Sequence, residues 1–370
     1  MLLLEKAFSG RDKSCGDGLT PRAVAELGKL GVVIPSMHRV DGLRIVRAER
    51  MREVLWPQRA GFAGVGGTSR RTVLDAAVLD AAVTSGAVLR EDSPARNLLF
   101  ENDRICGVLL EDGSSVSTSF VAVACGAGSA LAASLGARRS RDTLQGVAIR
   151  SYASSTKSYD RYLEASIVVK SRGALPGYGW VFPMGDGSVN LGYGVLTRAG
   201  SPAVNLRREL KIYHAQVRDR WDLGPFERDW AWRLPMSVER RHGNGWVALG
   251  DAAGLVNPCN GEGIDYALES GRMAAEVMLT GCDPTEASAR YEARLAGELD
   301  WFLDASRRFA QTIRHPALLN ALLRGAMLSD FTMGMTAAVL GNTLSPDGRG
   351  VLERVVRAGD RVLRVWYLKQ

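Results

Sequence analysis

The chain has 370 residues, of which 46% are hydrophobic and 24% charged, a balance typical of a folded globular protein. This length allows two domains or one large discontinuous domain, because single cores stop growing at about 250 to 300 residues. The net charge is +7, but basic residues form no run with interleaved aromatics, so nucleic acid is not an expected partner.

The cysteines and the longest apolar stretch bear on where the protein works. Its five cysteines are odd in number and show no CxxC or Cys/His spacing, which favours a reducing, cytoplasmic compartment and predicts no metal site. The longest uncharged apolar stretch, residues 331–346, is shorter than the ~20 residues of a spanning helix. We therefore expect a protein that does not cross a membrane.

The sequence begins with an apolar strand that ends on an acid, Glu5. Dinucleotide-binding folds place such an acid on the adenosine ribose, roughly 20 residues after a glycine-rich loop. If Glu5 is this acid, the strand, loop and helix that should precede it, on the order of 30 residues, are missing from the sequence. We expect a chain without them to bind a dinucleotide poorly.

The first 138 residues alternate strand-like and helix-like patterns. After a Gly-rich turn we expect, in chain order, a helix from about residue 21, two strands within 42–56, an amphipathic helix from 71 to 86 that runs into a strand, a hairpin over 97–116 and a buried strand at 120–124. The hairpin turn is expected at Asp112-Gly113, a pair that favours tight turns.

The composition shifts between about residues 140 and 235, where strand patterning and most of the aromatic residues are found. A strand at 246–250 then enters a turn and a helix from 263 to about 280, and helical patterns dominate to residue 370. The order predicts an α/β protein, α+β overall. It has a Rossmann-like nucleotide-binding domain, discontinuous in sequence, with an inserted mostly antiparallel β substrate domain and a helical C-terminal region.

We assign the domains by these composition shifts. The nucleotide-binding domain comprises residues 1–37, 62–138 and 240–285, and the substrate domain comprises 38–61 and 139–239. The helical C-terminal region comprises residues 286–370.

The segment most suggestive of chemistry is WVALGDAAGLVNPCNGEGIDYALESGRMAA, which starts at Trp246. A buried strand delivers Asp251 at its carboxyl end, small residues let a ligand approach the backbone, and Gly261-Glu262-Gly263 opens a helix. A helix N-terminus carries roughly +0.5 charge and unpaired N–H groups. It therefore suits the electron-rich edge of a flavin.

This segment resembles the second flavin-binding motif of the p-hydroxybenzoate-hydroxylase-like FAD proteins, and its wording is most similar to the geranylgeranyl reductase family. The family pattern has Thr or Ser where this chain has Asn260, and commonly a larger apolar residue at Cys259. The resemblance implies FAD as cofactor, with Asp251 on its ribityl or phosphate portion. Gly261, Gly263 and Ile264 would then supply backbone contacts to the ring.

Three further segments resemble the same family. RDKSCGDGLTPRAV is similar to its Cys-Gly-x-Gly loop beside the cofactor, and RRTVLD is similar to its helix start, in which an arginine meets FAD. The segment around Cys125 is similar to a family turn that usually holds an acid. The cofactor residues implied are Glu5, Cys15, Gly16, Gly18, Arg71 and, near the adenine, Ala95.

PGYGWVFPMGDGSVNLGYG resembles the family's YxWxFP motif in the substrate domain. Tyr178 and Trp180 lie two positions apart on an expected strand, so both rings face the same side. An aromatic wall suits an isoprenoid chain, since each buried CH₂ is worth about 0.8 kcal/mol; an aromatic core face is the alternative. Cys15 is interpreted either as a packed or cofactor-contacting residue or as a proton donor.

The resemblance implies an FAD-dependent reductase that saturates a C=C bond in a polyprenyl chain, with Cys15, Tyr178 and Trp180 as catalytic candidates. Hydride transfer must be accompanied by protonation, for which Cys15, Tyr178 and a water ordered by Glu262 are the candidates. Similarity to actinobacterial members favours the isoprenoid tail of menaquinone. Geranylgeranyl lipid or diphosphate reduction and an aromatic or quinone monooxygenase remain alternatives, as does a flavoprotein fold that cannot hold FAD.

The remaining partners follow from the lipid substrate. The electron donor is expected to be NAD(P)H or a reduced protein carrier. The helical tail, residues 315–370 with its basic WYLKQ end, is a candidate for peripheral contact with the inner face of the cell membrane, and a helical cap over the substrate domain is the alternative.

Overall fold

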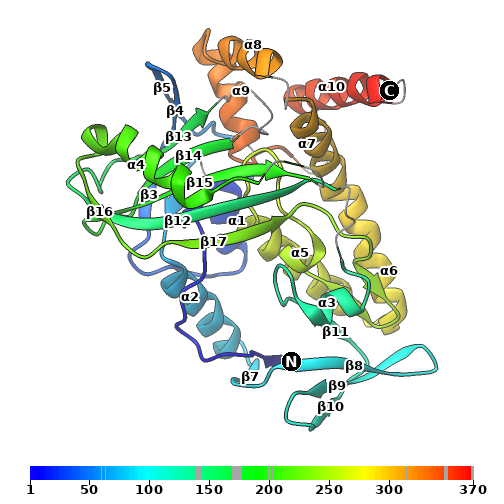
Figure 1. The fold of residues 1–370 in the computed structure, drawn as a ribbon. Helices are drawn as coiled ribbons and strands as arrows, with labels where there is room; N and C mark the ends of the chain where they lie inside the picture. The colour runs from blue at the N-terminus through cyan, green and yellow to red at the C-terminus, as the bar shows by residue number, and fades with distance from the viewer. Residues whose placement is uncertain are drawn as a thin grey trace.

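A computed structural model describes residues 1–59, 61–62, 64–138, 143–168, 177–198, 201, 203–313, 316–345 and 349–367. The side chains of residues 168, 316 and 365–367 are not described, so the basic WYLKQ end lies outside the described side chains. A large sheet occupies one half of the molecule, and helices surround a smaller parallel-stranded unit in the other half (Figure 1).

The large sheet has eight strands in the order β16-β12-β15-β14-β13-β4-β5, with β17 also paired to β12. Its strands are β4 (Gly42–Arg47), β5 (Arg50–Leu55), β12 (Gln145–Ser155), β13 (Tyr162–Val168), β14 (Gly177–Pro183), β15 (Ser188–Thr197), β16 (Leu223–Phe226) and β17 (Trp230–Pro235). All neighbours are antiparallel except β13 and β4. The β-rich insert that the sequence predicts is therefore present, and it recruits the early β4–β5 hairpin.

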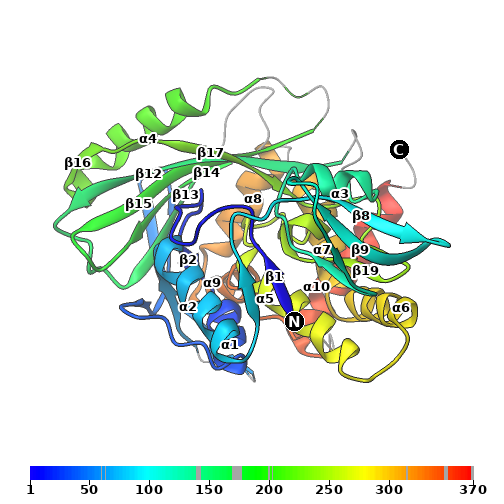
Figure 2. The ribbon, with the colours of Figure 1, turned by 90° about the horizontal axis from the view of Figure 1, so that it is seen from below.

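One face of this sheet is covered by α4 (Leu206–Trp221), a helix that the strand-rich interpretation of this region did not include. Its Tyr213 and Trp221 pack against Val181 and Leu191 of the central strands. The helices α1 (Pro21–Lys29), α2 (Arg71–Thr84) and α5 (Ile264–Met278) lie on the other side (Figure 2). Because side chains alternate along a strand, the even-numbered residues of β12, β14 and β15 face that second side.

The nucleotide-binding unit contains two short parallel pairs. β1 (Leu2–Leu4) pairs with β7 (Val88–Arg90), and β11 (Val121–Val123) pairs with β19 (Trp246–Ala248). β19 is joined in turn by β18 (His242–Gly243). These parallel strands with flanking helices confirm the expected Rossmann-like α/β character of this half.

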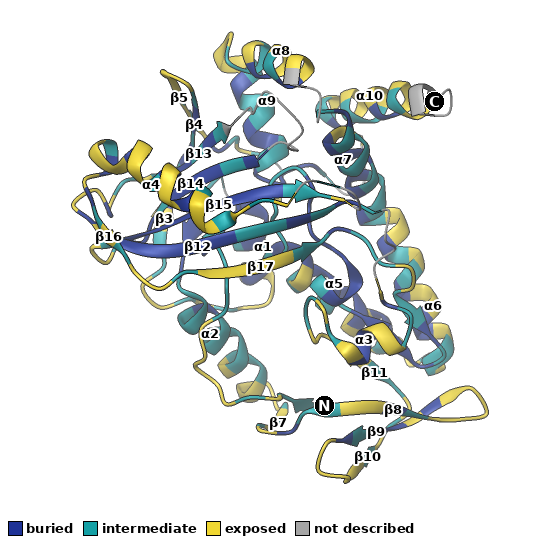
Figure 3. Ribbon diagram, viewed as in Figure 1, coloured by how far each residue is buried: buried dark blue, intermediate teal, exposed yellow. Residues whose placement is uncertain are grey.

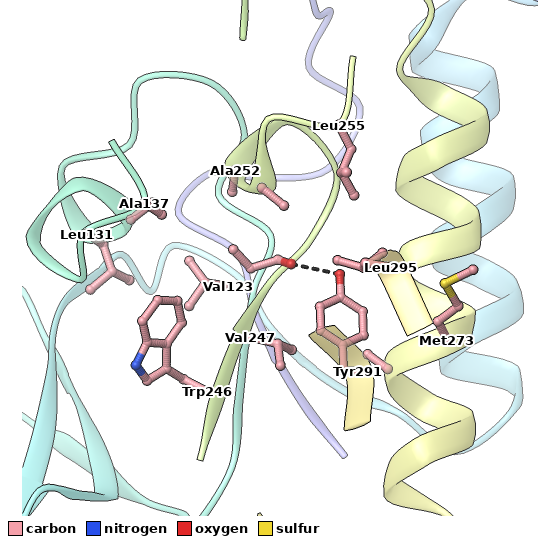
Figure 4. Close-up of a cluster of buried hydrophobic side chains, with 14 of the residues drawn as sticks. Val123, Leu131, Ala137, Trp246, Val247, Ala252, Leu255, Met273, Tyr291 and Leu295 are labelled. Atoms are coloured by element: carbon pink, nitrogen blue, oxygen red, sulfur yellow. Dashed lines mark hydrogen bonds between the residues drawn. The ribbon is translucent and has the colours of Figure 1, made fainter. Parts of the chain in front are cut away.

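A cluster of buried side chains holds this half together. It includes Val123, Val247 and Leu295, and the hydroxyl of Tyr291 donates to the carbonyl of Ala248 at 2.9 Å (Figure 4). Tyr291 is fully buried, so this bond satisfies a polar group that would otherwise cost ~1–3 kcal/mol. The contact fixes α6 (Pro284–Leu295) against β19, the strand that precedes the site.

Residues 95–117 form a three-stranded meander and not the single hairpin expected. β8 (Ala95–Glu101) and β9 (Arg104–Leu110) turn at Asn102-Asp103, and the expected turn at Asp112-Gly113 joins β9 to β10 (Ser115–Ser117). Asn102 and Asp103 both have positive φ, which Asn and Asp tolerate better than most residues. The remaining small elements are β2 (Gly18–Leu19), β3 (His38–Val40), β6 (Gly66–Thr68), which pairs with both, and α3 (Ala130–Ser134).

The C-terminal region is helical, as expected. Its elements are a π-helical turn (Ala296–Asp300), α7 (Trp301–Thr312), α8 (Pro316–Ala326), α9 (Asp330–Leu340) and α10 (Val351–Tyr367). In the described residues no helix is long and apolar enough to cross a membrane. The division into domains by residue range stays a prediction.

Candidate active site

Glycine shapes the turn that follows β19. Gly250 and Gly254 have φ of 52° and 67°, in the left-handed region that favours glycine. A Cβ on Gly254 would lie 2.6 Å from the carbonyl carbon of Ser237, so no side chain fits there. The turn (Gly250–Ala253) brings Asp251 to the N-terminus of α5, where its Oδ1 lies 3.0 Å from the Cβ position of Gly263.

The Asp251 carboxylate forms no hydrogen bond or ion pair with another described residue. Burial raises its pKa to about 6, and the positive charge of Arg71 opposes that rise. Asp251 is partly exposed, so its unused acceptor oxygens are open to donors from a ligand. The hydroxyl groups of a ribityl chain are donors of this kind, so the residue fits the cofactor role that the sequence predicts.

The N-terminus of α5 is capped by an acid from its own loop. The N-cap, Gly263, has no side chain to cap the helix, and the N–H of Ile264 donates to Oε1 of Glu262 at 3.0 Å. The N–H of Gly261 donates to the carbonyl of Asn257 at 2.8 Å. The amides of Gly261 and Ile264, expected to contact a flavin ring, thus have partners within the chain.

Glu262 is partly exposed, and its surroundings on balance disfavour its ionised form. Burial, then the nearby Asp265 carboxylate, raises its pKa well above the usual range. The same acid is close enough to raise the pKa of both Cys15 and Tyr178. A carboxyl group with a raised pKa therefore lies beside two of the three residues predicted to be catalytic.

The Cys-Gly-Asp-Gly loop, residues 15–18, lies against the face of the large sheet opposite α4. The Cys15 sulfur accepts the N–H of Asp17 at 3.3 Å, and burial raises its pKa to about 11, with partial opposition from Arg71. The thiol is thus protonated near neutral pH. A Cβ on Gly16 would lie 3.4 Å from Trp180 and from Phe182, and one on Gly18 would lie 3.0 Å from Phe182, so glycine permits this close approach.

Asn190 joins this loop to the aromatic strand. Its Nδ2 donates to the carbonyl of Cys15 at 2.9 Å and to Oδ2 of Asp17 at 2.8 Å, while its Oδ1 accepts the indole N–H of Trp180 at 3.0 Å. Tyr152 also donates to Asp17 Oδ2. The sequence interpretation missed Asp17, Tyr152 and Asn190, although Asn190 stands within the recognised aromatic segment.

Tyr178 and Trp180 face the same side of β14, as predicted, with ring centroids 5.6 Å apart. The Tyr178 hydroxyl donates to the carbonyl of Asn260 at 2.6 Å and lies 3.7 Å from the Cβ position of Gly261. Trp180 lies over Gly192, where a Cβ would be 2.0 Å from the indole. The aromatic strand therefore contacts the loop that opens α5.

Arg71 lies at the start of α2 and supports the same site from a third direction. Its guanidinium binds Asp75 at 2.9 and 3.2 Å, and its charge opposes the rise that burial causes in the pKa of Cys15 and of Asp251. The fold thus brings together ten of the residues that the sequence predicts for the site: Cys15, Gly16, Gly18, Arg71, Tyr178, Trp180, Asp251, Gly261, Gly263 and Ile264.

Glu5 and Ala95 belong to a separate group near β1 and β7. The carbonyl of Glu5 accepts the N–H of Ser93 at 2.9 Å, and its carboxylate accepts the N–H of Ala7 at 3.2 Å. Cys125 also lies near this carboxylate, whose charge adds to the rise that burial causes in the pKa of the Cys125 thiol.

Within the described residues, no group of three His, Cys, Asp or Glu side chains is arranged to hold a metal ion.

Several solved structures that share this architecture are described as flavoproteins. A geranylgeranyl bacteriochlorophyll reductase-like protein from Thermoplasma acidophilum matches with a TM-score of 0.69 at 22% identity, covering 100% of this chain and 92% of that one. The flavin-dependent brominase Bmp2 matches with a TM-score of 0.74 at 15% identity, covering 100% and 93%. The family model described as tryptophan halogenase matches residues 71–314. Fold and site together define a flavin-dependent oxidoreductase.

Sequence relatives narrow this class. The menaquinone reductase of Mycolicibacterium smegmatis is 36% identical over 96% of this chain and 89% of its own length, and that of Mycobacterium tuberculosis strain H37Rv is 36% identical over 99% and 90%. Digeranylgeranylglycerophospholipid reductase 1 of Methanopyrus kandleri is 28% identical over 85% and 84%. The chain belongs to the geranylgeranyl reductase family, and it also matches the tryptophan halogenase family model.

Proposed function

We propose that this protein is an FAD-dependent reductase that hydrogenates a C=C bond in the isoprenoid tail of menaquinone. The observation that carries the proposal is the contact between the aromatic strand and the α5 loop, made by the Tyr178 hydroxyl on the Asn260 carbonyl. It sets an aromatic surface for an apolar chain directly beside the loop that would hold the flavin ring. The identity of 36% to menaquinone reductases supports this tail as the substrate.

The residues that would hold the cofactor lie around the turn after β19. Asp251 has free acceptor oxygens, Arg71 contributes positive charge, and the N-terminus of α5 favours electron density at the ring edge. Glu262 occupies that N-terminus through the N–H of Ile264, so it would have to share or yield this position. When bound, reduced flavin supplies the hydride for the reduction.

The protein's own residues would orient the substrate, and Tyr178 and Trp180 are the side chains placed to do so. Tyr178 is half-buried and Trp180 is buried, and each has its polar atom satisfied within the protein. The half-buried Tyr178 ring therefore offers apolar surface without an unpaired donor, which suits an alkene and its methyl branch, and the buried Trp180 ring packs beside it with the ring centroids 5.6 Å apart. We assign both residues to positioning the isoprenoid unit.

We place the proton for the second alkene carbon on Glu262, passed directly or through a water. Burial and the Asp265 carboxylate raise its pKa well above the usual range, and an effective general acid has a pKa nearer the working pH than that of an ordinary carboxyl group. Burial raises the pKa of the Cys15 thiol to about 11 and also raises the pKa of the Tyr178 hydroxyl, so neither group gives up its proton readily near neutral pH. Hydride and proton together convert C=C into CH–CH.

α10 supports a peripheral membrane contact because it buries acidic side chains and exposes apolar ones, whereas an ordinary surface helix does the opposite. Glu353 is buried against Arg59 and Asp360 is buried against Arg308, while three valines, Val351, Val355 and Val362, point outward at 70%, 51% and 69% exposure. The basic residues Arg354 and Arg361 are also exposed. Figure 3 shows exposed segments along α10. An outward face with apolar and basic residues suits an anionic bilayer surface.

α8 and α9 add to this face. Leu318, Leu322, Leu328 and Phe331 are exposed along α8 and at the turn into α9. α8, α9 and α10 lie at the same end of the molecule (Figure 1). We assign this end to the inner surface of the cell membrane, where it would take its lipid substrate while the rest of the protein stays in the cytoplasm.

Product mass tests the reaction and its alternatives. Purified protein, reductant and a prenyl substrate should yield a product heavier by two hydrogens. A product heavier by one oxygen would instead assign the chain to the monooxygenases that share its fold. Reduction of geranylgeranyl lipid or diphosphate in preference to menaquinone would assign one of these as the substrate instead. The electron donor is identified by comparing rates with NAD(P)H and with a reduced protein carrier.

A further inference from the structure

A pocket lies beside the candidate active site, next to the segment that leads into the Cys-Gly-Asp-Gly loop. It has a volume of about 240 Å³ and is lined by Asp12, Arg70, Thr72, Arg150, Tyr152, Glu227, Arg228 and Trp230. Asp12 is three residues before Cys15, and the Tyr152 hydroxyl donates to Asp17, so the pocket and the site share this loop. The pocket is too small for a whole dinucleotide, since sites for drug-sized ligands are ~300–1,000 Å³.

The pocket contains a buried cation that the protein does not fully satisfy. Arg150 is 2% exposed, and its Nη2 binds Asp12 and the carbonyl of Lys13. Its Nε is buried and has no partner among the described residues. A buried, unpaired guanidinium donor costs free energy unless a ligand accepts from it.

Two more arginines and a helix end face the same pocket. The guanidiniums of Arg70 and Arg150 lie 4.2 and 4.6 Å from the ring centroid of Tyr152. Arg70 also binds Asp186 at 3.1 Å, whereas Arg228 stacks on Trp230 at 4.6 Å and has no ion pair among the described residues.

α2 begins at this pocket. Its N-cap is Arg70, which makes no capping hydrogen bond, and Thr72 in its first turn lines the pocket. The N–H groups of Arg71 and Thr72 have no acceptor within the described chain. Free amides at a helix N-terminus are donors suited to an anion.

We propose that this pocket binds a phosphate group of a small-molecule reactant. Arg70, Arg150 and Arg228 outnumber the lining acids Asp12 and Glu227, of which Asp12 is already paired with Arg150. Guanidiniums and helix amides together are the donor set that phosphates take. The phosphate has two possible sources: a nicotinamide dinucleotide that donates electrons, or the diphosphate head of a prenyl substrate.

The proposal that a phosphate binds here is independent of the proposed function, and only the identity of the molecule that carries the phosphate rests on it. Trp230 lines the pocket with 43% of its surface exposed, so its indole could stack on a nucleobase. Replacement of Trp230 therefore separates the two sources. A prenyl diphosphate has no base to stack, and its binding should depend on the arginines alone.

The test is calorimetric binding of inorganic pyrophosphate to the flavin-loaded protein, compared with Arg70→Gln, Arg228→Gln and the exposed control Arg290→Gln. We expect saturable binding that weakens about 10-fold in the first two variants and is unchanged in the control. Flavin content and circular dichroism establish that each variant is folded. No saturable binding by the parent protein, or equal binding by all variants, would overturn the proposal.

Two kinetic arms identify the source. If it is a dinucleotide, Trp230→Leu and Arg228→Gln should raise the KM for NADH or NADPH in flavin reduction and leave reduction by dithionite unchanged. If it is a prenyl diphosphate, geranylgeranyl diphosphate should displace pyrophosphate, and Arg228→Gln should weaken it while Trp230→Leu does not. Because pyrophosphate binding needs no turnover, a failure of the proposed reaction would be seen separately, as absence of product with dithionite as reductant.

Discussion

The hydroxyl of Tyr178 donates to the carbonyl of Asn260 across 2.6 Å, and this bond joins residues 82 positions apart in the chain. Tyr178 belongs to the large sheet, and Asn260 belongs to the loop that opens α5. Asn260 is itself held by its Nδ2, which donates to the carbonyl of Leu340 at 2.7 Å. The aromatic strand, the α5 loop and the C-terminal helices therefore meet at this one residue.

Removing this bond should impair turnover without unfolding the protein. Tyr178→Phe keeps the ring beside Trp180 but loses the donor, and a single hydrogen bond is worth about 1 kcal/mol. We expect the hydrogenation rate to fall about 5- to 10-fold, with flavin content unchanged. Steady-state rates for Tyr178→Phe and for Tyr159→Phe, an exposed control at 66%, provide the check, and equal rates would contradict the role given to Tyr178.

Glu262→Gln should remove the proton source while it keeps the helix cap. The amide oxygen of glutamine can still accept the N–H of Ile264, so α5 should remain in place. We expect kcat to fall about 100-fold, within the range for loss of a general acid, and Cys15→Ser to have a much smaller effect. The control is Glu286→Gln on the exposed face of α6. A Cys15→Ser variant that loses more activity than Glu262→Gln would move the proton to the thiol.

Gly192→Ala and Gly194→Ala form a matched pair on one strand. A Cβ at Gly192 would lie 2.0 Å from the Trp180 indole, whereas one at Gly194 would meet Ala148 at 3.5 Å and Trp180 at 3.7 Å. The first should displace the indole and break its bond to Asn190, costing about 1–3 kcal/mol of unfolding free energy. The second should be nearly neutral. Urea denaturation followed by tryptophan fluorescence distinguishes them, and equal midpoints would show that the indole does not fill the space over Gly192.

Asp251 should make the flavin-free protein less stable as the pH rises. Burial raises its folded-state pKa to about 6, above an unfolded value of about 3.9. Its stabilising contribution is therefore complete below about pH 4 and is lost as the pH passes through 6. Asp251→Asn should thus exceed the parent protein in unfolding free energy by about 1–2 kcal/mol at pH 7.5 and by nothing at pH 4.

Urea denaturation at both pH values measures this difference, with Asp80→Asn on the exposed side of α2 as control. The same Asp251→Asn variant should retain less flavin. A pH-independent difference between Asp251→Asn and the parent would mean that the carboxylate is not buried as described.

The outward face of α10 should control membrane binding. Val355→Glu places a negative charge among Val351 and Val362, which repels an anionic bilayer. We expect sedimentation with vesicles containing anionic lipid to fall several-fold, and the activity on a short, soluble prenyl substrate to stay unchanged. Val33→Glu, at a position 84% exposed in the loop after α1, is the control. Equal losses in both variants would assign the contact to some other face.

Local pattern predicted much of this molecule, because helices such as α2 and α5 and the strand before Asp251 depend on periodicity and on turn residues close in sequence. The hydrogen bonds of Asn190 could not be predicted in this way. They depend on the pairing of β15 with β12 and β14, which sets Asn190 opposite Tyr152 and Phe182 and turns it toward a loop 175 residues away in sequence.

The capping role of Glu262 illustrates the same limit. The sequence predicted that Glu262 lies at the N-terminus of α5 and orders a water. Its high pKa arises from burial and from Asp265, and Asp265 accepts from Thr20 and Asn342 in distant segments. Burial produced by tertiary packing, rather than residue type, therefore raises the pKa of this acid.

The central claim is tested most directly by adding the purified protein and a reductant to membranes that carry menaquinone and measuring the mass of the quinone tail. A gain of two hydrogens, absent from a sample with Glu262→Gln in place of the parent, is the result expected. A flavin-loaded protein that leaves the tail mass unchanged, or that adds oxygen to the quinone, would contradict the assignment as a menaquinone-tail reductase.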